Sequence, residues 1–283
     1  MSYIFFGTPT FAAAILRTLL DAGFTPLAVV CNPDRPAGRK KTLTPPAVKT
    51  LISGGGKDIS ILQPEKLGSD FEEELKRLKA DFYVVSSYAK IIPRRVLLLP
   101  RLGTIGVHPS LLPKYRGSSP IQSAILAGET ETGVTLYLMD DKLDHGPTIA
   151  KRNVSIAPAD TYVTLHNKLA EAAGQLLVKT FPRFAAEEIE PQPQNEEEAT
   201  ATQKFTSGDS FVSEKDLKNA ESGMHPEEAV LVLRKIRALN PEPGAWTLRD
   251  GKRVKLLGAV MDDKRTLKLT RVQKEGKKPV DRI

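Results

Sequence analysis

Short apolar runs alternate with amphipathic stretches along the first part of the chain, and this alternation constrains the fold most. Apolar residues at helical spacing separate the runs, as in Phe11, Ile15 and Leu19. Strands separated by helices imply right-handed crossovers, and therefore a parallel sheet with helices on both faces. The sequence predicts an α/β, doubly wound, Rossmann-like domain. Its predicted strands are Tyr3–Phe6, Leu27–Val30, Ile59–Leu62, Phe82–Val85 and Thr104–Val107.

The remainder of the chain predicts a second, smaller module. A helix over 161–184 ends the first domain, and the stretch 187–203 is rich in Glu, Pro, Gln, Asn and Thr, which is typical of a linker. A helix over 227–239 and three short alternating segments between 245 and 270 follow, which indicates a small β-barrel or meander. The expected domains are 1–185 and 204–283, joined by a linker over 186–203.

Composition excludes several classes of protein. No apolar run approaches the ~18 residues of a membrane-spanning helix, and the first residues, MSYIFFGTP, lack the basic region of a secretory signal. One cysteine, Cys31, cannot form a disulfide within a monomer, and the four histidines show no metal-ligand spacing. No heptad pattern indicates assembly. We therefore expect a monomeric cytoplasmic protein without a metal.

Positive charge is concentrated near the end of the chain. Of the net charge of +7, residues 204–283 carry +6 and residues 1–203 carry +1. A second basic stretch, 34–49, has a net charge of +4 and follows the second predicted strand. Two basic regions indicate a polyanionic partner, most often a nucleic acid, and the alternative is a solvated lysine-rich surface.

The carboxyl ends of the predicted strands are the place to seek a ligand. The first turn, Gly7-Thr8-Pro9, lacks the G-x-G-x-x-G pattern that holds a pyrophosphate, so a nicotinamide enzyme is not expected. His108 follows the fifth strand, and its imidazole could accept and return a proton near neutral pH. Asp144 could orient that imidazole and stabilise its charge. On spacing alone, the pair could equally be a loop histidine and a turn aspartate.

Longer motifs around these two residues resemble a known superfamily. The hexapeptide HPSLLP over 108–113 and the later LDHGP over 143–147 resemble the signature of the folate-dependent formyltransferases. The resemblance implies a Rossmann-like formyltransferase domain and 10-formyltetrahydrofolate as the formyl donor.

Three further segments resemble the branch of that superfamily that acts on methionyl-tRNA. They are the basic loop over 32–41, the segment 117–122, and residues 236–247, which resemble the start of an OB-like C-terminal domain. The resemblance implies that the formyl group passes to the α-amine of initiator methionyl-tRNA, for translation initiation. The tRNA-binding residues that it implies are Arg35, Arg39, Lys40 and Lys41.

The resemblance also implies catalytic and donor-binding residues. His108 is expected to stabilise the oxyanion and to carry the transferred proton. Asp144 is expected to orient the imidazole of His108 and to stabilise its positive charge. Apolar side chains beside backbone polar groups suit a flat pteridine. The residues expected to contact the folate are Tyr88, Ala89, Lys90, Ile91, Ile92, Ser110, Leu111, Leu112, Pro113 and Leu143.

One position departs from the family pattern. An asparagine usually stands two residues before the histidine and donates to the oxyanion, and here that residue is Gly106. Losing one such donor typically costs about 10²–10³ in rate. Three explanations are open for this position. Another donor replaces the amide, the enzyme is slow without it, or the chain has changed or lost its chemistry. We expect an active enzyme. The alternatives are a formyltransferase for a nucleotide-linked amino sugar and a protein that binds tRNA or folate without catalysis.

Overall fold

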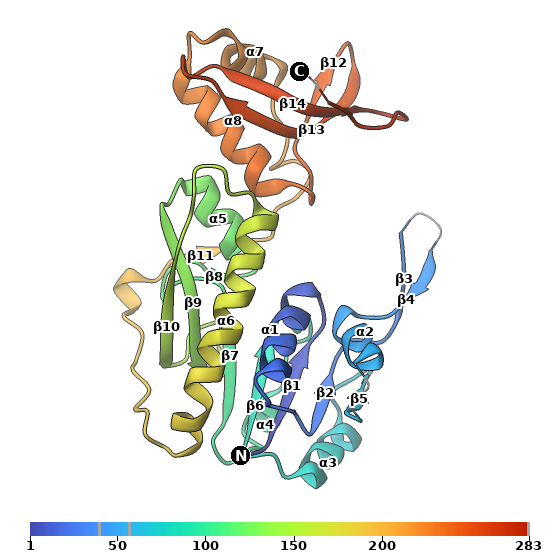
Figure 1. The fold of residues 1–283 in the computed structure, drawn as a ribbon, viewed down its shortest axis with the longest axis vertical. Helices are drawn as coiled ribbons and strands as arrows, with labels where there is room; N and C mark the ends of the chain where they lie inside the picture. The colour runs from blue at the N-terminus through green and yellow to red at the C-terminus, as the bar shows by residue number, and fades with distance from the viewer. Residues whose placement is uncertain (39–40, 56–57, 282–283) are drawn as a thin grey trace. The chain divides into compact units, whose positions relative to one another are not determined.

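The computed structural model describes residues 1–38, 41–55 and 58–281. The chain divides into two compact units (Figure 1). The first unit comprises Met1–Arg116, Thr132–Val154 and Asn167–Thr200, and the second comprises Gly117–Glu131, Ser155–His166 and Ala201–Ile283. Each unit is therefore assembled from segments that are separated along the sequence.

A seven-stranded sheet forms the centre of the first unit (Figure 1). β1 pairs in parallel with both β2 and β6, and the β2–β5 and β6–β7 pairs are also parallel, whereas β7 and β9 are antiparallel. The predicted α/β fold with a parallel-rich sheet is confirmed. From edge to edge the strands are β10 (Thr148–Ser155), β9 (Glu131–Leu138), β7 (Thr104–His108), β6 (Phe82–Ser86), β1 (Tyr3–Gly7), β2 (Ala28–Val30) and β5 (Ser60–Leu62).

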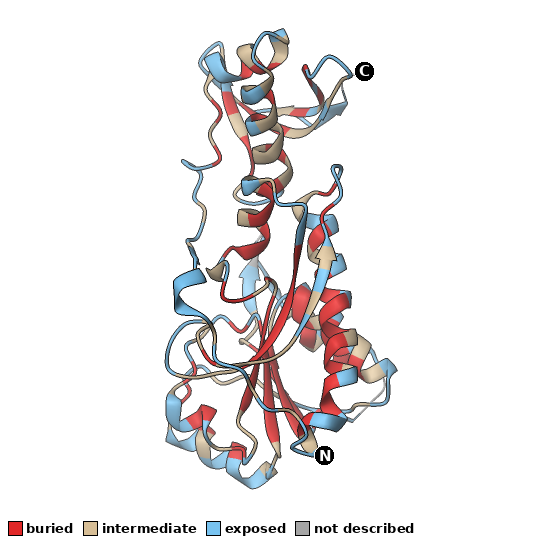
Figure 2. Cartoon of the chain, turned by 90° about the vertical axis from the view of Figure 1, so that its left-hand side faces the viewer, coloured by how far each residue is buried: buried red, intermediate tan, exposed pale blue. Residues whose placement is uncertain are grey.

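Helices cover both faces of this sheet, because alternate strand residues point to opposite sides. Tyr3 and Phe82 each contact Phe181 of α6, with ring centroids 5.1 Å apart. On the other face, Phe6 belongs to a core cluster that includes Phe71 of α3. Figure 2 shows the central strands as the most continuously buried part of the ribbon. The helices are α1 (Thr10–Asp21), α2 (Ala47–Gly54), α3 (Ser69–Leu78), α4 (Arg94–Leu97) and α6 (Tyr162–Ala185).

Several segments differ from the sequence expectation. The basic loop forms a hairpin of β3 (Arg35–Ala37) and β4 (Thr42–Thr44). The stretch that was predicted as a linker contains a 3₁₀ turn, η1 (Glu196–Glu198), and a short strand, β11 (Ala201–Thr202). Its Gln192 exchanges two backbone hydrogen bonds with Thr148 at the sheet edge. The backbone polar groups of Gln192 therefore bind the sheet, whereas a solvated linker would leave them to water. A second short strand is β8 (Arg116–Gly117).

The second unit contains a four-stranded antiparallel sheet with helices packed on it. Val232 and Ile236 of α8 share a core with Leu256 and Leu269 of the strands. The predicted strand-rich C-terminal module is thus confirmed, and the described strands have the open order β12-β13-β14-β15. The elements are α5 (Pro120–Ala127), α7 (Glu214–Ser222), α8 (Pro226–Leu239), β12 (Trp246–Arg249), β13 (Lys252–Met261), β14 (Leu267–Lys274) and β15 (Val280–Asp281).

Candidate active site

Strands β7 and β9 bring four side-chain positions together on one face of the sheet. Gly106 and His108 are two residues apart on β7, so they share a face. Across the antiparallel pair, Gly106 is opposite Tyr137 and His108 is opposite Thr135. Opposite residues share a face as well, so Tyr137 lies beside position 106. His108 is the last residue of β7, one residue further along than predicted, and Pro109 follows it.

His108 is buried, with 5% of its surface exposed, and both ring nitrogens face acceptors. Its Nε2 lies 2.8 Å from the backbone oxygen of Tyr115, and its Nδ1 lies 3.5 Å from Oδ2 of Asp144. A carbonyl oxygen only accepts, so Nε2 carries a proton. A proton that arrives at Nδ1 then meets the Asp144 carboxylate, which stabilises the cationic imidazole.

Asp144 lies in a turn after β9, with a φ of 50° in the left-handed region. Its Oδ1 accepts a hydrogen bond of 2.8 Å from the hydroxyl of Tyr137. One carboxylate oxygen therefore binds the phenol, while the other faces His108. The structure brings the two predicted catalytic residues together across the 36 residues that separate them.

Tyr137 was not singled out from the sequence. Burial raises the pKa of its hydroxyl well above the ordinary value, and the charge of Asp144 raises this pKa further. The phenol is therefore a neutral donor throughout the working pH range of most enzymes. Its one sequence signal is a single tyrosine among the β-branched and aliphatic residues of VTLYL, and the strand register was needed to place it opposite Gly106.

Two side chains from the predicted linker also reach the candidate site. Gln194 donates from Nε2 to the backbone oxygens of Asp144 and Gly146, at 2.9 and 2.8 Å. Arg116 binds Oε1 of Gln194 at 2.8 Å and a carboxylate oxygen of Glu196 at 2.7 Å. The segment around Gln194 therefore holds the turn that carries Asp144.

The segment 110–113 is fixed against β9. Thr135 donates from Oγ1 to the backbone oxygen of Ser110 at 2.7 Å and accepts from the backbone nitrogen of Leu112 at 3.0 Å. Ser110, Leu112 and Pro113 are buried, whereas Leu111 is half-buried. These contacts place the segment directly after His108, beside the strand that carries Tyr137.

The other residues expected at the folate differ in how far they are buried. Tyr88 and Ile92 belong to the core cluster under the sheet. Ile91 and Leu143, in contrast, expose 94% and 72% of their surface, and Ala89 is also exposed. Lys90 is half-buried and donates to the backbone oxygens of Pro64 and Glu65.

Three buried polar atoms at the carboxyl edge of the sheet have no hydrogen-bond partner within residues 1–38, 41–55 and 58–281. They are Oδ1 of Asn32, Oγ of Ser86 and the hydroxyl of Tyr88. Asn32 follows β2, and Ser86 and Tyr88 lie at and just after the end of β6. Buried polar groups without partners are rare in folded proteins, so these atoms fit a site for a polar ligand.

Two of the predicted tRNA-binding residues, Arg35 and Lys41, are described on or beside the β3–β4 hairpin. Arg35 is exposed and pairs with Glu65 at 2.6 Å, and Lys41 is exposed just before β4. Arg39 and Lys40 lie outside the described residues. Lys49 pairs with Asp34 at 2.9 Å, so part of the predicted charge of this stretch is neutralised locally.

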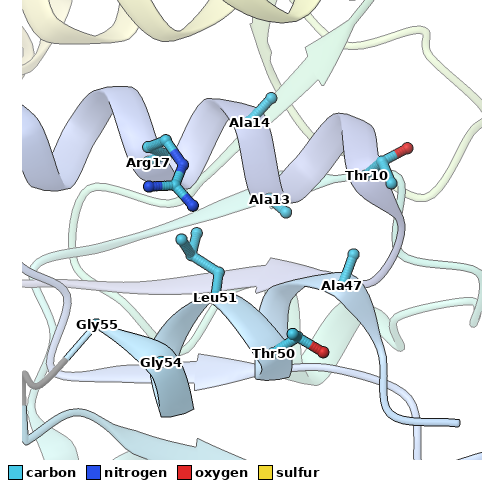
Figure 3. A pocket seen from close by; sticks show the side chains of 9 residues that line it. All are labelled: Thr10, Ala13, Ala14, Arg17, Ala47, Thr50, Leu51, Gly54 and Gly55. Carbon is cyan, nitrogen blue, oxygen red and sulfur yellow. The ribbon is translucent and has the colours of Figure 1, made fainter.

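A separate hollow of about 440 Å³ lies between α1 and α2 (Figure 3). Small residues such as Ala13, Ala14 and Gly54 form much of its lining, and Arg17 projects over it. Neither His108 nor Asp144 lines this hollow, so it is not part of the candidate site. The described ranges also contain no cluster of histidine, cysteine and carboxylate side chains able to hold a metal, and no helix long and apolar enough to cross a membrane.

Comparison with protein families identifies the class of the chain. A family described as formyl transferase matches residues 1–181, and one described as formyl transferase, C-terminal domain, matches residues 226–268. This chain belongs to the formyl transferase family, which confirms the resemblance drawn from its motifs.

Individual relatives narrow the comparison. The chain is 43% identical over 243 residues to the methionyl-tRNA formyltransferase of Halorhodospira halophila, covering 86% of this chain and 74% of that protein. The structure of a methionyl-tRNA formyltransferase from Clostridium thermocellum has a TM-score of 0.59 at 17% identity and covers 99% of both chains. HypX from Aquifex aeolicus, solved with tetrahydrofolic acid, has a TM-score of 0.66 at 18% identity. That match covers 99% of this chain and 46% of HypX. Both structures support the fold.

Proposed function

We propose that this chain transfers a formyl group from 10-formyltetrahydrofolate to the α-amine of methionyl-initiator tRNA, in the cytoplasm. The observation that carries the proposal is the pair of His108 and Asp144 at 3.5 Å, in a chain that is 43% identical to a methionyl-tRNA formyltransferase. An acceptor of the amino-sugar type would give the basic hairpin and the basic C-terminal module no role.

The proposed chemistry follows from the protonation of His108. The acceptor amine attacks the formyl carbon, and the new nitrogen–carbon bond leaves a proton to be removed. Nδ1 of His108 accepts that proton, because Nε2 already donates to Tyr115. The imidazolium that results is stabilised by Asp144, and its charge stabilises the oxyanion of the intermediate. As the bond from carbon to N10 of the folate breaks, His108 returns the proton to N10.

The donor site is proposed at the carboxyl edge of the sheet, beside His108. The exposed side chains of Ile91 and Leu143 offer apolar surface to a flat ring. Asn32, Ser86 and Tyr88 hold buried polar atoms without partners in the described structure, and these fit the polar rim of such a ring. The buried Leu112 and Ile92 support the site from below rather than lining it.

The tRNA site is proposed on two basic surfaces. Arg35 and Lys41 at the hairpin, with Arg39 and Lys40 between them in sequence, provide charge for the acceptor end. The module from residue 204 onward carries a net charge of +6 and is proposed to contact the tRNA backbone. Phosphate contacts from lysine and arginine make such binding dependent on salt concentration.

The decisive experiment measures transfer of a labelled formyl group from 10-formyltetrahydrofolate to methionyl-initiator tRNA. Uncharged tRNA and a nucleotide-linked amino sugar serve as controls for the acceptor, and His108→Ala serves as a control for the site. We expect turnover on the charged tRNA alone, and its loss in the variant. Turnover on the amino sugar, or tight binding of both substrates without any transfer, would contradict the proposal.

A further inference from the structure

Gly106 and Tyr137 occupy facing positions on neighbouring strands. They are direct partners in the antiparallel register of β7 and β9, so side chains at the two positions project from the same face of the sheet, beside one another. Gly106 supplies no side chain, and Tyr137 supplies a large one with 4% of its surface exposed. The two residues share one space beside Asp144.

The tyrosine fills the volume that a side chain at position 106 would need. A Cβ atom there would lie 2.4 Å from both Cε1 and Cζ of Tyr137, and 2.8 Å from its hydroxyl oxygen. Real Cβ contacts are essentially never shorter than 3.0 Å. Glycine is therefore required at 106 as long as the phenol keeps its place.

The phenol is held there by chemistry as well as by packing. Its hydroxyl donates to Oδ1 of Asp144 at 2.8 Å, and the other oxygen of the same carboxylate faces His108 at 3.5 Å. A neutral donor on one oxygen limits rotation of the carboxylate and leaves the second oxygen directed at the imidazole. A hydrogen bond to a charged acceptor is stronger than one between neutral groups.

We propose that Tyr137 is a positioning residue that occupies, from the neighbouring strand, the space of the side chain missing at Gly106. It holds Asp144 against His108, and Gly106 is the matching change that makes room for its ring. The proposed effect of Tyr137 on catalysis rests on the proposed function. The competition of the two side chains for one space does not depend on that function.

The first test removes the hydroxyl alone. Tyr137→Phe keeps the ring in place, and we expect kcat to fall roughly 10- to 100-fold, the size of one hydrogen bond to a charged group, with KM for both substrates within about twofold. Tyr3→Phe is the matched control, because it also removes a buried hydroxyl, one that donates to the backbone oxygen of Phe24 at 2.9 Å. The control is expected to keep its kcat. An unchanged kcat in Tyr137→Phe would overturn the positioning role.

The second test exchanges the two positions. Gly106→Asn alone forces its Cβ into the ring, and Tyr137→Leu alone loses the phenol. Leucine has no counterpart of Cε1, Cζ or the hydroxyl, the three atoms nearest to the added Cβ. We therefore expect the double variant, in which an amide can reach the vacated space, to exceed the more active single variant at least about tenfold in kcat. Single effects that simply multiply in the double variant would overturn the exchange.

Thermal unfolding of the unmodified chain, the two single variants and the double variant separates this proposal from the proposed function. If the unmodified chain transfers no formyl group, the proposed function fails. Thermal unfolding still tests whether a side chain at position 106 and the ring of Tyr137 compete for the same space. Gly106→Asn should lower the Tm when Tyr137 is present and leave it nearly unchanged in the Tyr137→Leu background. An equal loss of Tm in both backgrounds would overturn the exchange whatever the activity.

Discussion

The negative charge of Asp144 is the single residue property on which the proposed proton transfer depends most. Asp144→Asn keeps the shape of the side chain, and its amide can still accept from Tyr137. The imidazolium of His108 would lose its counter-charge, so we expect the rate of the chemical step to fall roughly 10- to 100-fold or more. Single-turnover formyl transfer at saturating donor measures this step directly. A variant with the original single-turnover rate would show that Asp144 does not act through its charge.

At the residue scale, motifs could locate His108 and Asp144, but they could not locate Tyr137. The candidate catalytic histidine can be found because it begins a recognisable sequence motif, HPSLLP. Tyr137 acts through its position opposite Gly106, and that position depends on which residues of β7 and β9 pair. A shift of one residue in this register would turn the phenol to the other face. The glycine at 106 was visible in the sequence, but the residue that fills the space beside it was not.

At the scale of elements, the segment around Gln194 is tied to the catalytic turn by two hydrogen bonds. Gln194→Ala removes both donors to the backbone of Asp144 and Gly146, so the turn gains freedom and we expect kcat to fall several-fold. Gln192→Ala is the matched control, because the Gln192 side chain donates to the backbone oxygen of Glu190 nearby. Steady-state kcat for the two variants measures the difference. Equal activities would show that this segment is a passive connection.

Buried tyrosines of the central sheet are expected to make the folded state less stable at alkaline pH. Burial raises the pKa of Tyr83 on β6 from 10.0 to about 12. The folded state holds the phenol proton more tightly than the unfolded state, so the contribution is full below pH 10 and is lost as pH rises toward 12. We expect the free energy of unfolding in urea to fall by roughly 2–3 kcal/mol more in the unmodified chain than in Tyr83→Phe over that range. Parallel curves for the two chains would contradict this expectation.

Strands could be predicted from the sequence more fully than the segments that complete the site. The five predicted strands agree with β1, β2, β5, β6 and β7 to within one residue at either end, because parallel strands appear as short runs rich in apolar residues. α7 was missed, since only Leu217 and Ala220 of its nine residues are buried and the rest of its surface is polar. The stretch 187–203 has few apolar residues for a different reason, because polar side chains such as Gln194 attach it to the first unit.

At the scale of the whole molecule, basic charge on two separate units predicts how tRNA binding responds to mutation. Lys41 is exposed just before β4 in the first unit, and Lys255 is exposed on β13 of the second. If both contact one tRNA, each charge reversal, Lys41→Glu or Lys255→Glu, should weaken binding about 3- to 10-fold and reduce the dependence of log Kd on log salt concentration by about one. The two free-energy effects should add in the double variant, because sites that share no contact partner act independently. Lys179→Glu, at an exposed position of α6, is the control and should leave the Kd unchanged. Titration of labelled initiator tRNA at several salt concentrations measures the Kd of these four variants and of the unmodified chain. A normal Kd for Lys255→Glu would remove this part of the second unit from the tRNA site and leave the hairpin as the remaining basic surface.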